Sequence, residues 1–350
     1  MLLSLQQQYR KLGSVFLKEL QVTHLTGQIE QLSRYLPPAV TEGCLEIDLI
    51  GSQGLLGGRP VRRNCDLWAT LPSDQGARQI CHEFLKQNDC LDNEERNKTA
   101  PVVWSGAYRL LREWSSPGSD LARGLGDLFF EFDTGSNTGV TPIVVAAFAH
   151  ETELASARSL IRLYCHSLSL ETLPETQQRQ IDSLLNAIPQ SGFLRHVALM
   201  SGRDPMALRL VVTLRLLSVV RFLETLGWEG PLDEVVALLK AILKTTLLLG
   251  VQFDVGDTVK GKIGLEIAVN RNSKDRELRC VFDYLQTRGM CCNAMRQLLE
   301  HWLKEQPRDG YRNLIIKVSF PVAGGASARG ASARGTSARS ASAKGYLVFT

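Results

Sequence analysis

The chain has 350 residues, of which 44% are hydrophobic and 22% charged, which is typical of a globular protein with a large core. Its net charge of +4, from 40 basic and 36 acidic residues, is too small to indicate nucleic acid as a partner. The eight cysteines include no CxxC pair, and no His/Cys set has zinc spacing, so we expect reduced cysteines and no zinc site.

The hydrophobic segments do not predict a leader peptide or a membrane span. The first twenty residues carry glutamines and charges where a signal peptide has an apolar core. The longest apolar run, VVALLKAILKTTLLLG, is short and is interrupted by Lys240 and Lys244. We therefore expect a cytoplasmic protein with no membrane partner.

Helical and strand patterns alternate in a regular order along the chain. Paired amphipathic segments, with apolar residues three and four apart, cover 3–36, 75–114, 151–188, 216–249 and 275–306. Each is followed by two strand-like runs, at 44–71, 127–149, 193–214, 251–270 and 313–350. The order helix, helix, strand, strand thus occurs five times.

The strand-like runs have one apolar and one polar face. CLEIDLI places Glu46 and Asp48 opposite Leu45 and Ile47, and the run from Val259 to Asn270 separates its lysines from its aliphatic residues in the same way. The helices need the apolar face, and closing the sheet would turn the polar face into the wall of a lumen. Short connections within each strand pair require antiparallel strands.

These patterns predict an α+β fold. We expect a ten-stranded antiparallel β-barrel surrounded by about ten α-helices, built as five ααββ repeats in a single domain over residues 1–350. The alternative is two α+β domains that divide near Ala149–Glu151, although no long linker is present there.

One low-complexity stretch, from Ala326 to Gly345, repeats a five-residue unit as ASARG, ASARG, TSARS and ASAKG. Its glycine, serine and alanine content cannot bury a core, so we predict a flexible loop over 323–343 between the last two strands. One interpretation of the repeat is a neutral expansion. The alternative is a cationic flap at the barrel mouth that helps to hold an anionic substrate.

Five ααββ units with a polar inner face resemble the aromatic prenyltransferases of the ABBA, or PT-barrel, type. The resemblance covers essentially the whole chain and rests on architecture. Members of that family bind an isoprenoid diphosphate inside the barrel through arginines, lysines and tyrosines, often in R/K-x-K and K-x-Y motifs. The matching residues are Lys260 and Lys262 in VKGKIGLE, Lys317 in LIIKVSF, Lys344 and Tyr346 in AKGYLVF, Arg209 in ALRLVV, and Arg62 in PVRRNCDLW. For each single lysine, a solvated sheet face is the alternative.

The resemblance also implies roles for other lumenal residues. Glu46 matches a first-strand glutamate that accepts a hydrogen bond or proton from the aromatic substrate in the fungal indole branch of the family. Glu131 and Glu266 are rivals for that role, and Glu46 has the alternative of pairing with a basic residue. Trp68, Phe129 and Tyr346 are the aromatic residues expected to shield a carbocation from water.

The implied function is transfer of an isoprenoid group from a prenyl diphosphate to an aromatic or peptide acceptor by a monomeric enzyme. There is no DDxxD motif, so we expect no required metal, although Mg²⁺ could bridge the diphosphate to Asp48, Asp66 or Asp254. The alternative is a non-catalytic binding protein that keeps the barrel. Few tyrosines at lumenal positions and the SARG repeats favour that alternative.

Overall fold

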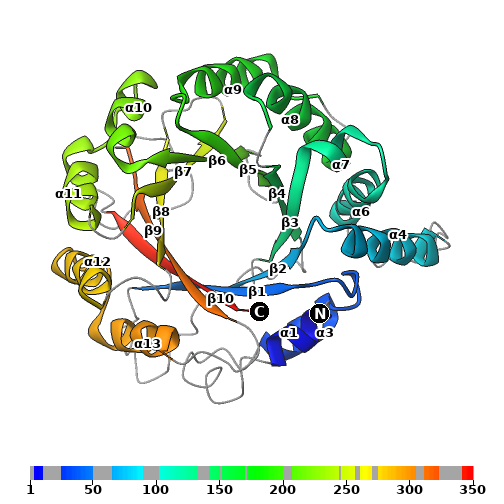
Figure 1. Cartoon of the computed structure of the whole chain (residues 1–350), viewed down its shortest axis with the longest axis horizontal. Helices are drawn as coiled ribbons and strands as arrows, with labels where there is room; N and C mark the ends of the chain where they lie inside the picture. Colours follow the sequence, from blue (N-terminus) through cyan, green and yellow to red (C-terminus); the bar gives the residue numbers. More distant parts are fainter. Residues whose placement is uncertain are drawn as a thin grey trace, which may run out of the picture.

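The computed structural model describes thirteen segments of the chain, which are 4–10, 25–49, 65–89, 102–132, 142–149, 152–169, 172–200, 207–243, 246–256, 261–269, 275–304, 311–322 and 341–349. Within them, ten antiparallel strands form one closed barrel (Figure 1). Each strand pairs with its neighbours in the sequence, and β1 pairs with β10 to close the ring. The strands are β1 (Glu42–Asp48), β2 (Cys65–Leu71), β3 (Leu125–Phe132), β4 (Pro142–Phe148), β5 (Phe193–Met200), β6 (Ala207–Arg215), β7 (Leu248–Val255), β8 (Ile263–Val269), β9 (Arg312–Phe320) and β10 (Ser342–Phe349).

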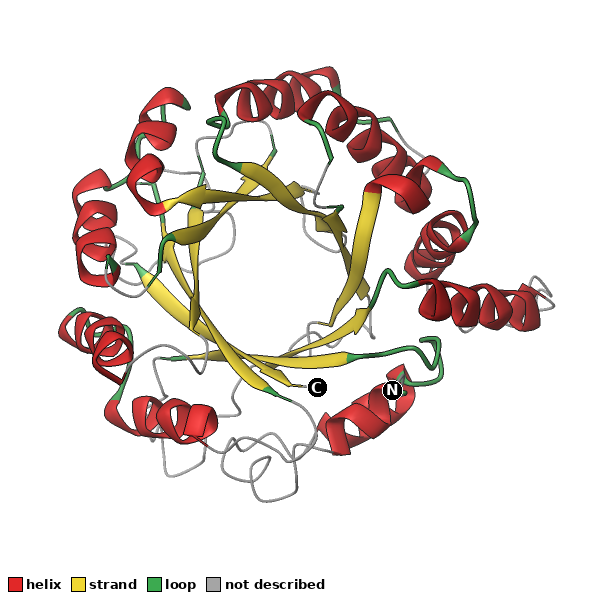
Figure 2. Ribbon diagram, in the orientation of Figure 1, coloured by secondary structure: helices red, strands yellow, loops and turns green. Residues whose placement is uncertain are grey.

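The helices form a ring around the outside of the barrel (Figure 2). They are α1 (Leu5–Arg10), α3 (Leu25–Leu32), α4 (Gln75–Asp89), α6 (Val102–Ser115), α7 (Asp120–Gly124), α8 (Leu154–Ser169), α9 (Glu175–Ala187), the 3₁₀ turn η1 (Leu216–Ser218), α10 (Val219–Thr225), α11 (Leu232–Ile242), α12 (Asp275–Thr287) and α13 (Asn293–Lys304). Among the described helices, none is long and apolar enough to cross a bilayer. Among the described residues, two helices precede each strand pair, and the short α7 and η1 are additional.

The hydrophobic core lies between the barrel and the helices. The outward residues of the strands, such as Leu45, Leu67, Phe130, Leu210 and Leu265, are fully buried there. They alternate with the polar inner residues, so the two faces predicted from the sequence are the two faces of the barrel wall. Burial of the outer face against amphipathic helices provides the main driving force for this arrangement.

The prediction of a closed barrel is confirmed, and the two-domain alternative is wrong. Val145 of β4 pairs with Ala198 of β5 across the proposed boundary, so both halves of the chain share one sheet. Most strand limits lie within two residues of the prediction, but the starts of β7 and β10 differ more. β7 begins at Leu248, three residues early, and β10 begins at Ser342, inside the segment expected to be a loop. Residues 323–340 of that segment lie outside the described residues.

The side chain of Tyr164 joins β4 to β5 where their ladder is short. Direct pairing covers Val145–Ala147 with His196–Ala198, and Val144 and Leu199 are next in register. There, the Tyr164 hydroxyl donates a hydrogen bond to the Val144 carbonyl and accepts one from the Leu199 amide, at 3.0 Å. Tyr164 is fully buried, so its hydroxyl replaces a backbone hydrogen bond that would otherwise be missing from the barrel wall.

Replacing this tyrosine should therefore destabilise the barrel. Tyr164→Phe leaves a carbonyl and an amide buried without partners, and we expect the free energy of unfolding in urea to fall by about 2–4 kcal/mol. The matched control is Tyr284→Phe, because the Tyr284 hydroxyl donates to the Glu234 carbonyl at 3.3 Å in a half-buried position. The control should lose less than about 1 kcal/mol. Equal losses in the two variants would contradict the bridging role of Tyr164.

Candidate active site in the barrel lumen

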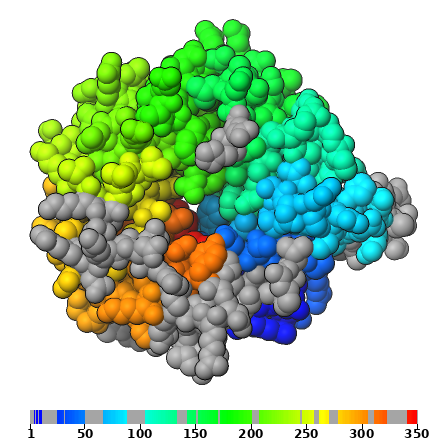
Figure 3. Space-filling model, in the orientation of Figure 1, coloured from blue at the N-terminus to red at the C-terminus, as the bar shows by residue number. Residues whose placement is uncertain are grey.

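The lumen contains two neighbouring cavities lined by inner residues of the strands. The larger, of about 120 Å³, is lined by Glu46, Asp66, Glu131, Arg209, Gln252, Asp254, Lys262, Ile263, Gly264, Lys317, Ser319, Ser342 and Lys344. The smaller, of about 30 Å³, is lined by Trp68, Glu131, Val145, His196, Ala198, Arg209, Val211, Gln252, Glu266 and Tyr346. A narrow opening at the centre of the molecule is visible in the view along the barrel (Figure 3).

The two cavities differ in character along the barrel axis. Residues of the larger cavity, such as Asp66, Asp254, Lys262 and Lys344, lie near the strand ends that hairpin connections join. The smaller cavity lies further toward the ends that connect to helices, and Val145, Ala198 and Val211 make part of its wall apolar. The lumen therefore has a charged half at the hairpin end and a more apolar half beyond it.

Arg209 and Asp254 form a bidentate ion pair across β6 and β7. Their strands place them directly opposite each other. The Nε atom of Arg209 lies 2.8 Å from Oδ1 of Asp254, and Nη2 lies 3.3 Å from Oδ2. Burial alone would lower the pKa of Arg209, but the attraction of Asp254 outweighs it and raises that pKa. The guanidinium is thus held in a fixed orientation beside the cavity.

A second charged group joins Glu46 on β1, Lys317 on β9, and Lys344 and Tyr346 on β10. The Nζ atom of Lys344 donates a hydrogen bond to Oε1 of Glu46, and Nζ of Lys317 lies 3.4 Å from the Tyr346 hydroxyl. Burial alone would raise the pKa of Glu46, yet Lys344 and Lys317 outweigh it and hold that pKa below its usual value. Glu46 is therefore an ionised carboxylate at neutral pH.

Lys317 is the most deeply buried of the lumenal lysines, with 8% of its surface exposed. Burial, followed by repulsion from Arg209, lowers its pKa to about 8, although Glu46, Glu266 and Glu131 oppose that change. The ammonium is therefore mostly charged at neutral pH but loses its proton more readily than an exposed lysine. An anion bound beside it would favour the charged form.

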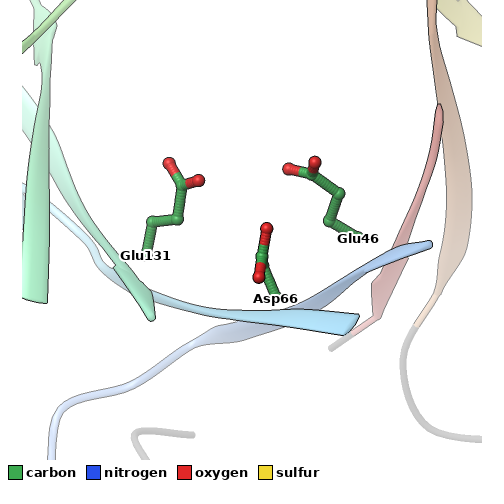
Figure 4. Close-up of side chains that lie close together, drawn as sticks. All are labelled: Glu46, Asp66 and Glu131. Carbon is green, nitrogen blue, oxygen red and sulfur yellow. The ribbon is translucent and has the colours of Figure 1, made fainter. Parts of the chain in front are cut away.

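Three carboxylates from the neighbouring strands β1, β2 and β3 meet at the larger cavity. Oxygen atoms of Glu46 on β1, Asp66 on β2 and Glu131 on β3 lie within 4.8 Å of one another (Figure 4). Hard oxygen ligands in this arrangement suit Mg²⁺. The residues lining the two cavities include five carboxylates, with Asp254 and Glu266, against the four cations Arg209, Lys262, Lys317 and Lys344. The described lumen thus has no surplus of positive charge.

Aromatic side chains line the smaller cavity or pack next to it. The rings of Trp68 and Tyr346 meet edge to face with centroids 5.8 Å apart, and Phe129 meets His196 in the same way at 5.3 Å. The indole nitrogen of Trp68 is buried and has no hydrogen-bond partner among the described residues. It is therefore a donor available to a ligand in the smaller cavity.

The structure brings most of the predicted site residues together. Glu46, Arg209, Lys262, Lys317 and Lys344 line the larger cavity, whereas Trp68 and Tyr346 line the smaller one and Phe129 packs next to it. Arg62 and Lys260 lie outside the described residues, so their predicted roles stay predictions.

Sequence reasoning missed His196 and Gln252, which also line the lumen. The register of β5 shifts between Leu194 and His196, so strict alternation does not assign His196 to a face. Gln252 does alternate with the buried residues of β7, but the prediction singled out only charged and aromatic side chains. The period-two pattern could have found it.

The ring of His196 is enclosed by the barrel wall. Burial, with a smaller contribution from Arg195, lowers the pKa of His196 from 6.5 to about 3. The imidazole is therefore neutral in the folded protein at any physiological pH and has one nitrogen able to accept a proton or hydrogen bond.

This shift predicts a loss of stability in mild acid. As the pH falls below about 6.5, the unfolded chain protonates His196 while the folded protein does not, so unfolding is favoured down to about pH 3. At pH 5 the cost should be about 2 kcal/mol. Urea unfolding near pH 7 and pH 5 would measure it, and His196→Gln should show a smaller decrease than the unmodified chain. An equal decrease in both proteins would contradict a neutral His196.

Comparisons with known proteins bear on the fold. No family model and no curated protein matches the chain. Among solved structures, it is similar to 5-dimethylallyltryptophan synthase from Streptomyces coelicolor, with 11% identity, a TM-score of 0.56, and coverage of 100% of this chain and 98% of that one. The same enzyme in complex with DMASPP and Trp gives 11% identity and a TM-score of 0.53, covering 100% and 96% of the two chains. The prenyltransferase PriB in its apo form gives 10% identity and a TM-score of 0.55, covering 97% and 94%. The closed ten-stranded barrel with its outer ring of helices is therefore the PT-barrel fold that these aromatic prenyltransferases have.

Proposed function

We propose that this chain is a prenyltransferase that moves an isoprenoid group from a prenyl diphosphate to an aromatic or peptide acceptor in the barrel lumen. The observation that carries the proposal is the division of one enclosed lumen into a charged half and an aromatic, partly apolar half. A prenyl diphosphate has the same two parts. The solved structures that are similar to this chain include one in complex with DMASPP and Trp, which supports the proposal at the level of the fold.

The diphosphate would lie in the larger cavity. Lys317, Lys344 and Lys262 offer ammonium groups from β9, β10 and the residue before β8, and Arg209 offers a guanidinium already oriented by Asp254. Departure of the diphosphate builds negative charge on its oxygens, and fixed cations stabilise that charge more than they stabilise the bound substrate. The catalytic contribution of these residues would come from their fixed positions.

The charge balance of the lumen favours a role for Mg²⁺. The cavity linings hold five carboxylates and four cations, so a diphosphate entering alone would meet repulsion from Glu46, Asp66 and Glu131. Their oxygens are close enough together to hold one ion. A bound Mg²⁺ would supply positive charge to the leaving diphosphate, and Asp66 and Glu131 would change from repelling groups to its ligands, while Glu46 would stay paired with Lys344.

The aromatic residues would protect the allyl group. Trp68 and Tyr346 line the smaller cavity and Phe129 packs next to it, so the reacting carbon would lie beside their rings. Ring faces stabilise nearby positive charge, and their apolar surface keeps water from capturing the carbocation. The Trp68 indole N–H and neutral His196 could orient the polar groups of an acceptor.

Glu46 would receive the proton that the acceptor loses. Its carboxylate is buried, ionised and next to Lys344, and Glu131 lies close by as an alternative base. A base in this position lets the acceptor regain aromaticity after the new bond forms. Lys344 would hold the carboxylate in place until the proton arrives.

A non-catalytic binding protein is the second candidate. Two observations favour it, since Arg209 and Lys344 already have carboxylate partners and the larger cavity measures about 120 Å³. Such a protein would bind a small ligand in the lumen without turnover. Turnover of dimethylallyl diphosphate with any of a panel of indoles, phenols and aromatic peptides would exclude it.

Diphosphate binding tests the charged half directly. Calorimetry with dimethylallyl diphosphate should show binding that tightens when Mg²⁺ is added, and Lys317→Met should weaken it by roughly tenfold or more. Lys304→Met is the matched control, because Lys304 is an exposed lysine at the end of α13 on the outer ring. If both variants bind as the unmodified chain does, the diphosphate is not held in this cavity.

The Glu46→Gln variant tests whether Glu46 acts as a general base or only forms an ion pair with Lys344. We expect kcat to fall by roughly a hundredfold, within the usual contribution of a general base. Affinity for the diphosphate, measured without Mg²⁺, should hold or improve, because the substitution removes a negative charge beside the site and releases Lys344. If kcat is unchanged and only affinity moves, Glu46 serves only to pair with Lys344, and Glu131→Gln becomes the next variant to measure.

A further inference from the structure

Exposed large hydrophobic residues are concentrated at one edge of the barrel. In the segments that the structure describes, seven such residues are exposed, and five of them belong to the connections around β5, β6 and β7. These five, which we call the leucine rim, are Phe193, Leu217, Leu243, Leu247 and Leu248. The other two, Leu154 and Tyr311, belong to α8 and to the residue before β9. Soluble surfaces scatter such residues, so a local concentration indicates a contact surface.

Backbone contacts make the leucine rim continuous. The Leu216 amide, next to Leu217 in η1, donates to the Leu247 carbonyl at 2.9 Å. Leu248 pairs with Arg215 at the end of β6, and Phe193 pairs with Thr213 two residues earlier. All of these residues lie where strands connect to helices, which is the end of the barrel opposite the charged half of the lumen.

The shape of the rim limits what can cover it. Leu217 is 83% exposed and Leu247 is 78% exposed, so these side chains project from the surface and do not line a groove. Projecting leucines are buried most easily by a deformable partner, and the interfacial region of a lipid bilayer is deformable. A rigid protein partner would require matching pockets for each of them.

The charged residues beside the leucine rim indicate that a surface bound there carries negative charge. Arg195 in β5, Arg215 at the end of β6 and Arg221 in α10 are exposed, and each lies within four residues of Phe193 or Leu217 in the sequence. None of the three forms an ion pair with a described residue. Each arginine close to an anionic membrane strengthens binding by about fivefold. Exposed leucines flanked by free arginines fit a surface that is both apolar and anionic.

We propose that the leucine rim docks this end of the barrel on an anionic lipid surface. The leucines would enter the boundary between headgroups and acyl chains, and the arginines would contact lipid phosphates. No spanning helix is needed for peripheral docking of this kind. Phe193 and Leu248 also share the inner side of the wall with Thr213 and Val211, so the docked end borders the apolar half of the lumen. The proposal concerns binding alone and does not depend on turnover in the lumen.

Co-sedimentation of the full chain with vesicles tests the proposal. Vesicles of phosphatidylcholine mixed with phosphatidylglycerol should bind the chain, and vesicles of phosphatidylcholine alone should bind it at least tenfold less. The double variant Leu217→Gln/Leu247→Gln should lose binding to the mixed vesicles by roughly tenfold or more. Arg215→Gln/Arg221→Gln should lose it by an order of magnitude and should be less sensitive to added salt.

Matched controls keep the result interpretable. Leu154→Gln removes an exposed leucine outside the rim, and Arg34→Gln removes an exposed arginine on α3, so both should bind as the unmodified chain does. Thermal unfolding should show that all variants remain folded, because the replaced side chains are exposed. The proposal is overturned if the unmodified chain ignores mixed vesicles, or if the rim variants bind as well as the controls. A concentration-dependent dimer in sedimentation velocity, lost in the double leucine variant without any vesicle binding, would assign the rim to a second copy instead.

Discussion

The rest of the structure depends on the requirement that charges enclosed in the lumen compensate one another. Arg209 is held by Asp254, and Glu46 is held by Lys344, with Lys317 nearby at a lowered pKa. Removing such groups from water costs several kcal/mol per ion unless partners and hydrogen bonds replace the lost hydration. The barrel can therefore close over a charged interior because adjacent strands, β6 with β7 and β1 with β10, place opposite charges next to each other.

The pairing of lumenal charges also affects how a charged ligand can bind in the lumen. The described residues that line the two cavities include five carboxylates and four cations, so they offer a free diphosphate no net positive charge. Under the proposed function, a diphosphate would bind by an exchange of partners, in which lysines would turn from carboxylates to phosphate oxygens and the carboxylates would turn to a metal ion. Binding of this kind is a rearrangement of existing interactions, so its affinity depends on small differences between large opposing contributions.

The two ends of the barrel have distinct properties for a simple topological reason. Hairpin connections lie at one end of the strands and helix connections at the other, because every strand pair returns to the end at which it began. The charged lumenal residues lie near the hairpin end, whereas the leucine rim lies at the helix end. An amphiphilic substrate in the lumen and a lipid surface at the helix end would therefore lie along the same barrel axis. The polar group of the substrate would lie at the hairpin end.

The sequence by itself determined the order of elements and the two faces of each strand. Alternation placed Glu46, Lys317, Lys344 and Tyr346 on the inner face correctly, because a strand offers only two directions to its side chains. Only the tertiary structure decided which inner residues meet. The pairing of β1 with β10 brings Glu46 to Lys344 across almost the whole length of the chain, and the shifted register of β5 turns His196 into the lumen. Contacts between distant strands depend on register and closure, which arise from packing the entire outer core and not from the pattern of any one segment.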